Sequence, residues 1–170
     1  MTPLDEAKVL DKLLELHSGV DVRAHGLAER HAVRLHCGPG CASCCQDDLT
    51  VFTVEARRIQ NEYPDVLHET PGPEGGCAFL DEDGRCRVYG ARPYVCRSQG
   101  LPLRWLAEVE DTWVEYRDIC PLNEAGEPIE TLEPEACFLL GPAEEVLRAL
   151  QAGFADDALA RVKLRDLFLK

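Results

Sequence analysis

Apolar residues recur at helical spacing in the first part of the chain. Leu10 and Leu13 lie one helical turn apart, and this pattern predicts a helix that reaches about His17. The Ser-Gly pair at residues 18–19 then ends that helix, because glycine weakens a helix interior. A second helical stretch is predicted over residues 21–36, so the chain reaches its first cysteine through two helices.

Further helices are predicted downstream. Thr53 can cap a helix over residues 55–62, which Pro64 ends because proline disfavours helical geometry in the residue before it. Pro142 suits the first turn of another helix, and a last helical run covers residues 155–168. Helices therefore flank a central region that is rich in cysteine.

Strand signals are confined to the middle of the chain. Residues 77–80 and 85–89 predict two short strands joined by a turn with Gly84 late in it, and hence a small β-hairpin. The segment 105–120 alternates only in patches, which fits either strand pairing or a cover over a site. The predicted fold class is therefore mainly α with a small β-hairpin.

The length of 170 residues suits a single domain. The run PGPEGG at residues 71–76 is the strongest loop signal, and it separates the first four cysteines from the others. We expect one metal-stabilised domain over residues 1–170, with a core of irregular cysteine-rich loops at 37–120 and helical flanks at 1–36 and 141–170.

The chain is strongly acidic, with a formal net charge of -13. Thiolates bound to divalent metals would make it more negative still. Such a surface repels nucleic acid and anionic lipid, and no apolar run approaches the roughly 18 residues of a membrane helix. Because no secretory signal opens the chain, we expect a cytoplasmic protein with reduced cysteines, no nucleic-acid partner and no membrane association.

Nine cysteines dominate the candidate chemistry. Four of them fall in the run CGPGCASCC, from Cys37 to Cys45, whose glycines and proline forbid a regular helix. Cys41 and Cys44 have the C-x2-C spacing by which one tight turn aims two sulfurs at an ion, and Cys37 can join them. Cys44 and Cys45 are adjacent, so their side chains diverge, which indicates a second ion or a bridging role.

The number of thiols bears on the kind of metal site. Eight thiols match two tetrahedral S4 zinc sites, which are closed and therefore structural or storage sites. An iron–sulfur cluster would instead use four of them and leave the others for a second metal or for redox work. The eight candidate ligands are Cys37, Cys41, Cys44, Cys45, Cys77, Cys86, Cys96 and Cys120.

A run without acidic residues, from Gly84 to Ala107, holds five arginines in this acidic chain. Arg92 and Arg97 flank Cys96, and we expect their guanidinium groups to offset the negative charge of a thiolate-rich site. A solvated basic face is the plain alternative, and reception of an anionic substrate is another.

Two further residues are left open as metal ligands. Cys137 precedes Phe138 and two leucines, so a buried core thiol is as compatible with the sequence as a ligand is. His36 directly precedes the first cysteine, but a histidine on an amphipathic helix is more often a half-exposed surface group.

Taken together, these motifs resemble the YkgJ-type cysteine-cluster family, whose proteins carry a zinc- or iron-chelating CxxCxxCC domain. The resemblance rests on the cluster at 37–45, the CxFL at 77–80, the CxVY at 86–89 and the RPxxCR at 92–97. The first spacing here is three residues where the domain name has two, and the glycines of the loop accommodate it. The resemblance implies chelation of zinc or iron through the cysteine cluster.

The same cysteine pattern is similar to that of the flagellin lysine N-methylases, which implies an iron–sulfur centre as the alternative cofactor. No glycine-rich nucleotide fingerprint follows a strand here, so methyl transfer is an outlying interpretation. We therefore expect a metal-binding protein with two zinc ions, or alternatively an iron–sulfur protein with a redox or methyltransferase-related role. Metal ions are the partners that the sequence indicates; it names no protein partner or substrate and leaves open whether the chain is an enzyme.

Overall fold

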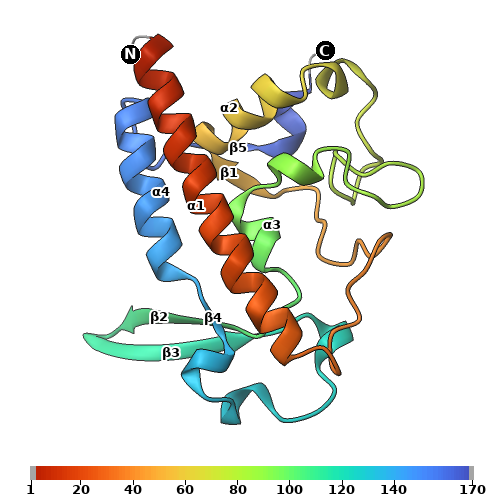
Figure 1. Cartoon of the computed structure of the whole chain (residues 1–170), viewed down its shortest axis with the longest axis vertical. Coiled ribbons are helices and arrows are strands. Elements are labelled where there is room, and N and C mark those ends of the chain that lie inside the picture. The colour runs from red at the N-terminus through yellow and green to blue at the C-terminus, as the bar shows by residue number, and fades with distance from the viewer. Residues whose placement is uncertain (1–2, 169–170) are drawn as a thin grey trace.

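One long helix, α1 (Pro3–Arg30), extends along the molecule in the computed structural model of the chain, which describes residues 3–168 (Figure 1). It packs beside α4 (Gly141–Phe154) through a stripe of buried side chains that includes Leu13, Val20 and Leu27. None of the described helices is long and apolar enough to cross a bilayer. The ends of the predicted domain, residues 1–2 and 169–170, lie outside the described part of the chain.

The predicted break between two helices at residues 18–19 is wrong, because α1 passes through it without interruption. His17 and Val20 on either side of the pair are buried against the body of the molecule, while Gly19 faces open space. A glycine in a helix interior costs only about 1 kcal/mol, which is less than the burial of an apolar side chain such as Val20 contributes. The predicted second helix also ends early, at Arg30.

The helix predicted at residues 55–62 is present as α2 (Thr53–Glu62), and it ends just before Pro64 as expected. Thr53 is its first residue and not its cap. The backbone N–H of Val54 donates instead to the side-chain oxygen of Gln151 at 3.0 Å. Gln151 is a fully buried residue of α4. This hydrogen bond therefore joins the start of α2 to a helix almost a hundred residues further along the chain.

A two-stranded sheet joins the start of α2 to the end of the chain. Strand β1 (Thr50–Phe52) leads directly into α2 and pairs antiparallel with β5 (Arg161–Lys163). The helical run predicted at 155–168 is therefore wrong. After α4 the backbone is extended at Ala155, and the residues near 162 alternate exposed and half-buried as a strand does.

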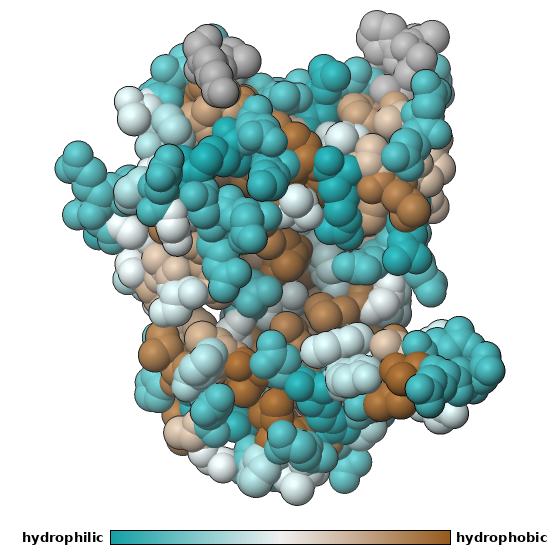
Figure 2. Space-filling model, turned by 180° about the vertical axis from the view of Figure 1, so that it is seen from behind, coloured by the Kyte–Doolittle hydropathy of each residue, from teal (hydrophilic) through white to brown (hydrophobic). Residues whose placement is uncertain are grey.

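A second sheet has the strand order β3-β2-β4. Strands β2 (Leu103–Val109) and β3 (Thr112–Asp118) form an antiparallel hairpin, and β4 (Phe138–Leu139) pairs in parallel with the start of β2. The turn consists of Glu110 and Asp111, both with positive φ, as a tight two-residue hairpin loop requires. This hairpin projects from the body of the molecule (Figure 2).

The hairpin predicted from residues 77–80 and 85–89 is not a pair of strands. A single isolated bridge joins Leu80 and Cys86, and turns surround it. A strand sends successive side chains to opposite faces, whereas residues 77–79 are all buried in the same core. Residues 77–89 therefore form an irregular loop and not a pair of strands.

Two apolar clusters lie on either side of β1 and α2. Val51, Ala56 and Ile59 belong to one cluster, which the cysteine-bearing loops and the last residues of the chain complete. Phe52 and Val54 belong to the other, together with α1, α4 and the start of β2. Alternate residues of one short segment thus hold the cysteine loops on one side and the helices on the other.

Short connecting helices complete the description. Helix α3 is Tyr94–Ser98, and Pro93 directly precedes it. The 3-10 helices are η1 Asp65–His68, η2 Tyr89–Ala91, η3 Pro121–Asn123, η4 Ile129–Thr131, η5 Pro134–Ala136 and η6 Leu164–Leu167.

The predicted fold class, mainly α with a small β-hairpin, is wrong in two respects. Strands form two separate sheets beside the helices, so the chain combines α and β structure and is not mainly α. The hairpin lies at 103–118 and not at 77–89, because strand pairing follows the alternating segment and not the buried one. The prediction of a metal-stabilised domain is not supported by the fold either, because residues 3–168 contain no group of side chains arranged to hold a metal ion.

Candidate metal centre

The first four cysteines lie on an irregular loop between α1 and β1. Two turns shape it, with the N–H of Cys41 donating to Gly38 at 3.0 Å and that of Cys45 to Ala42 at 2.9 Å. The loop also packs against the turn that contains Gly84. A Cβ atom built there would lie 3.2 Å from the carbonyl oxygen of Gly40, so the close approach of the two loops favours glycine.

A backbone hydrogen bond joins the two cysteine-bearing regions. The N–H of Cys77 donates to the carbonyl oxygen of Cys45 at 2.9 Å. Cys77 is buried, and Cys45 and Cys86 pack against the same apolar cluster. This hydrophobic wall excludes water from one side of the thiols, which favours a stable thiolate–metal bond.

One group of thiols surrounds Cys37. Partial burial raises the pKa of Cys37, and the neighbouring thiols of Cys41, Cys120 and Cys44 raise it further. Like charges disfavour one another, so these three sulfurs lie near enough to Cys37 to affect its pKa. Cys120 comes from the segment after β3, far from the other three in the sequence.

A second group contains Cys45, Cys77, Cys86 and Cys96. Burial raises the pKa of Cys96 strongly, with further contributions from Cys77 and Cys86. The pKa of Cys45 is raised too, and its neighbours include Cys77 and Cys96. Cys96 lies within α3, so a short helix brings this thiol to the loops.

Cys44 and Cys45 meet between the two groups. The Cys45 thiol donates a hydrogen bond to the Cys44 sulfur, which lowers the pKa of Cys44 to about 6 and raises that of Cys45. The adjacent side chains therefore touch and do not diverge. Cys44 is also a neighbour of both Cys37 and Cys96, so it lies where the groups adjoin.

The thiols are neighbours, but their sulfur atoms are not arranged as the ligands of a metal ion. Over residues 3–168, no group of three or more His, Cys, Asp or Glu side chains is arranged closely enough to hold a metal ion. All nine cysteines are free thiols. Soft thiolates nevertheless suit zinc and iron–sulfur clusters, and each group contains the four donors that such a site needs.

The structure also shows a cradle for one of these sulfurs. Gly100 has a positive φ of 90°, and a Cβ atom at this position would lie 2.5 Å from the Cys37 sulfur. Any larger residue would displace the thiol from its group. The donor chemistry and this fitted contact are compatible with metal binding by the cysteine loops.

Asn123 is a residue of the site that sequence reasoning missed. It is fully buried, and its amide nitrogen donates to the Cys37 sulfur at 3.2 Å and to the Gly100 carbonyl at 2.8 Å. Its amide oxygen accepts the N–H of His36 at 2.8 Å. The available sequence signal was its place three residues after Cys120 in the same short turn.

Replacing Asn123 is expected to loosen the Cys37 loop. Asn123→Ala leaves the Gly100 carbonyl and the His36 N–H without their partner, which should lower the free energy of unfolding by about 2–3 kcal/mol. Thermal unfolding measures this loss. Because the Asn123 hydrogen bond acts to lower the pKa of the exposed Cys37 thiol, the rate at which a thiol reagent labels Cys37 should fall. An exposed control, Asn61→Ala on α2, should change neither. An unchanged labelling rate in Asn123→Ala would contradict this role.

Arg92 and Arg97 were predicted to offset the charge of the thiolates. In the structure both guanidinium groups bind Asp21 on α1, and Arg97 also donates to the Gly90 carbonyl. Arg92 still lies close enough to Cys86 to lower its pKa, against the larger effect of burial. Charge compensation by Arg92 therefore remains a prediction with an electrostatic basis, while Arg97 serves mainly to bind α1.

A further arginine near the thiols comes from the last helical turn of the chain. Arg165 pairs with Asp47 and donates to the carbonyl oxygens of Gly72, Pro73 and Gly76, each at 3.0 Å. Its charge acts to lower the pKa of Cys77, although burial outweighs it. Sequence reasoning missed Arg165, because it lies almost sixty residues beyond the arginine-rich run.

The residues left open as ligands lie outside both groups. Cys137 is buried with Leu132 and Ala136, and burial raises its pKa, as expected for a core thiol. His36 is exposed, and only its backbone N–H contacts the site, through Asn123.

The chain thus combines α and β structure with irregular loops and a short helix that carry eight neighbouring thiols. It belongs to the class of cysteine-rich proteins with a candidate thiolate metal centre. A family model described as "CxxCxxCC: Putative zinc- or iron-chelating domain" matches residues 36–121, half of the chain. The chain belongs to this family, which confirms the resemblance drawn from its motifs. Searches of the curated proteins and of the solved structures gave no match. Family membership supports metal binding in general, with zinc and iron both within the description.

Proposed function

We propose that the protein binds two metal ions, each through four thiolates. The proposal is carried by the position of Cys41, Cys44 and Cys120 near Cys37 and of Cys45, Cys77 and Cys86 near Cys96, together with membership of a metal-chelating family. The first site would use Cys37, Cys41, Cys44 and Cys120. The second would use Cys45, Cys77, Cys86 and Cys96.

Zinc is the metal that this arrangement favours. Two S4 zinc sites use all eight thiols, whereas one iron–sulfur cluster uses four. An S4 zinc site has no open coordination position, so the bound ions would hold the loops together or be stored. Binding would draw the neighbouring sulfurs into a tetrahedral shell and hold the cysteine loops against the rest of the domain.

The metal content of protein purified without oxygen tests the proposal. We expect a colourless protein with about two zinc ions per chain, measured by elemental analysis and absorption spectroscopy. A brown protein that contains iron and acid-labile sulfide, with visible charge-transfer absorption, would instead establish the alternative, an iron–sulfur protein. Protein that holds neither metal after purification from medium containing both would refute metal binding.

Single variants of the adjacent cysteines test how the two sites are divided. Cys44→Ser should weaken the first site and Cys45→Ser the second, so each variant should lose about one of two zinc equivalents. Cobalt substitution then distinguishes the two remaining sites by their thiolate absorption bands. The matched control is Cys137→Ala, which should keep both equivalents. Identical spectra in the two serine variants would show that both cysteines serve one ion.

A further inference from the structure

A pocket of about 350 Å³ lies between the end of α1 and the loop that follows η3. Its volume is within the roughly 300–1,000 Å³ that is typical of small-molecule sites. Arg30, His31 and Arg34 line it from the end of α1 and the turn after it, and residues 125–127 line it from the loop. Leu132 adds an apolar wall. The pocket therefore combines cationic and apolar surface.

Arg34 is a buried guanidinium group without a carboxylate partner among the described residues. It is 7% exposed, and its Nε donates to the Asn123 carbonyl at 3.0 Å. Its Nη2 donates to the backbone carbonyls of Glu124 and Glu127, at 3.1 and 3.0 Å. Arginine is rarely buried unless it is paired, because neutral carbonyls cannot balance its charge. The positive charge of Arg34 is therefore available to an anion.

One nitrogen of Arg34 remains open to the pocket. Its Nη1 has no hydrogen-bond partner among residues 3–168, because the three bonds of this side chain use Nε and Nη2. Unlike the unpartnered Nε of Arg97, this nitrogen is not enclosed by protein. A ligand in the pocket can therefore accept a hydrogen bond from it.

Arg30 and His31 add two further groups to the lining. Arg30 is exposed and forms no ion pair with the part of the chain that the structure describes. The buried His31 ring donates through Nε2–H to the Ala136 carbonyl at 2.7 Å, so its Nδ1 faces no partner there. The carboxylate of Glu127 also belongs to the lining, but it accepts the Thr131 hydroxyl at 3.1 Å and pairs with neither arginine.

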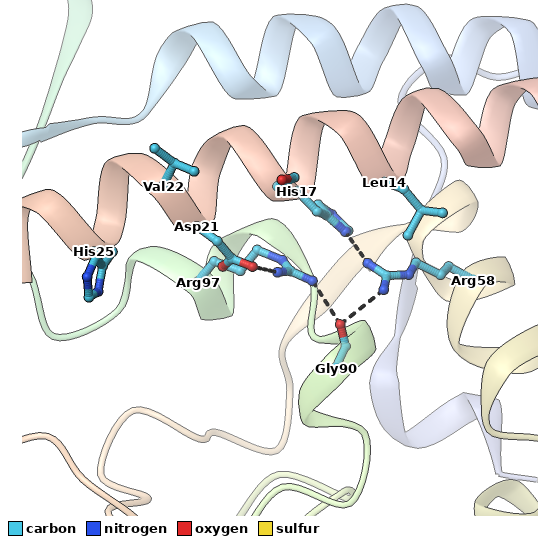
Figure 3. A pocket seen from close by; sticks show the side chains of 9 residues that line it. Leu14, His17, Asp21, Val22, His25, Arg58, Gly90 and Arg97 are labelled. Carbon is cyan, nitrogen blue, oxygen red and sulfur yellow. Dashed lines mark hydrogen bonds and ion pairs between the residues drawn. The ribbon is translucent and has the colours of Figure 1, made fainter.

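The larger pocket beside α1, at Arg58 and Arg97, lacks this excess of positive charge (Figure 3). There Arg58 pairs with Glu62 at 2.7 Å, and Arg97 pairs with Asp21 on α1. Each guanidinium group already has a carboxylate, so neither has charge left to offer a ligand. Unpaired guanidinium groups therefore distinguish the pocket at Arg34.

The donors that remain free at Arg34 favour a phosphate over a carboxylate. A carboxylate binds arginine best through two parallel N–H groups on neighbouring nitrogens, but carbonyls already occupy Nε and Nη2. Only Nη1 is left, so a second donor has to come from another residue, and Arg30 lines the same pocket. A tetrahedral phosphate directs oxygens to several sides, so it can accept hydrogen bonds from both arginines.

We propose that this pocket binds a small phosphate-bearing anion, with its phosphate group between Arg30 and Arg34 and its organic part against Leu132. The site is distinct from the two thiol groups and does not depend on which metal they hold. It adjoins the first group, because Arg34 binds the carbonyl of Asn123, whose amide donates to the Cys37 sulfur. An occupied pocket is therefore expected to restrain the Asn123 turn.

Titration of the metal-loaded protein with phenyl phosphate, inorganic phosphate and benzoate at constant ionic strength tests the proposal. We expect saturable shifts of the His31 imidazole resonance in NMR spectra with both phosphates, and tighter binding of phenyl phosphate than of benzoate. His68 on η1, outside the pocket lining, is the internal reference. Benzoate that binds as tightly as phenyl phosphate would overturn the phosphate assignment. If no probe gives a saturable shift, the arginines only stabilise the carboxyl end of α1, and the proposal is wrong.

Variants assign the binding to the charges of the lining. Arg30→Gln, unlike a change of Arg34, breaks no hydrogen bond of the described chain, and it should weaken phenyl phosphate binding about three- to fivefold. Glu127→Gln keeps an oxygen for the Thr131 hydroxyl but removes a negative charge, so it should strengthen binding about threefold. Arg148→Gln, on α4 and outside the pocket, is the matched control and should bind as the wild type does. Unchanged affinity in both lining variants would contradict recognition of an anion at this pocket.

Discussion

Removal of the bound metals is expected to unfold the cysteine loops and to lower the melting temperature by about 10–20 °C. This prediction rests on the proposed function. Between α1 and β1, and again between η1 and η2, the chain has turns and one isolated bridge but no regular helix or strand. Without metal these loops would keep the burial of residues 77–79 and the hydrogen bonds from Arg165 but would lose the thiolate–metal bonds. A loss of about 5 kcal/mol corresponds to this shift for a chain of 170 residues.

The measurement compares thermal unfolding before and after treatment with a strong chelator under reducing conditions, with metal content verified. Hydrogen exchange should rise first in residues 37–47 and 70–88, while α1 and α4 stay protected, because the helical cluster contains none of the eight cysteines. Return of the original melting curve on addition of zinc is the control. The same melting temperature in verified metal-free protein would contradict the prediction.

Loss of the buried carboxylate on α2 should have the second largest effect. Glu55 is 3% exposed, and one of its oxygens accepts both the His17 Nε2–H at 3.1 Å and the Tyr94 N–H at 2.7 Å. Glu55→Ala leaves these donors unpaired in the interior and should lower the free energy of unfolding by about 3–5 kcal/mol. The melting temperature should fall by about 10 °C.

Two further variants separate the hydrogen bonds from the charge. Glu55→Gln preserves the shape and an oxygen that can accept both hydrogen bonds, so it should lose less than half as much stability. Glu29→Ala, on the exposed face of α1, should melt as the wild type does. A melting temperature for Glu55→Ala within about a degree of the wild type would refute the assignment.

Glu55 also explains how the helices and the cysteine loops are coupled. The Tyr94 N–H belongs to the first residue of α3, which carries Cys96, and His17 lies in the middle of α1. A substitution of Glu55 is therefore expected to disturb the position of Cys96 in the second thiol group as well as the packing of the helical cluster.

Local signals were sufficient for two of the helices. Pro64 ends α2 and Pro142 lies in the first turn of α4, as predicted. Both effects act within a few residues, through the fixed φ of proline and its missing N–H. Such signals do not depend on distant parts of the chain, which is why they could be read correctly.

Local signals failed where distant contacts outweighed them. Gly19 favoured a helix end, but burial of Leu13, Val20 and Leu27 against the body keeps α1 continuous. Strand β5 forms because it meets β1 more than a hundred residues away, and no periodicity within 155–168 indicated this pairing. In each case the energy of tertiary packing exceeds a local preference of about 1 kcal/mol.

The sequence by itself determined the family and the kind of chemistry, because the spacing of cysteines in short motifs is a local property of the chain. Only the tertiary structure decided which thiols are neighbours. Cys120 joins Cys37 through the Asn123 turn, and Cys96 reaches the loops on α3, which Glu55 holds in place. The physical reason is that segments far apart in the chain are brought together by burial and long-range hydrogen bonds, and these contacts leave no pattern in any one segment.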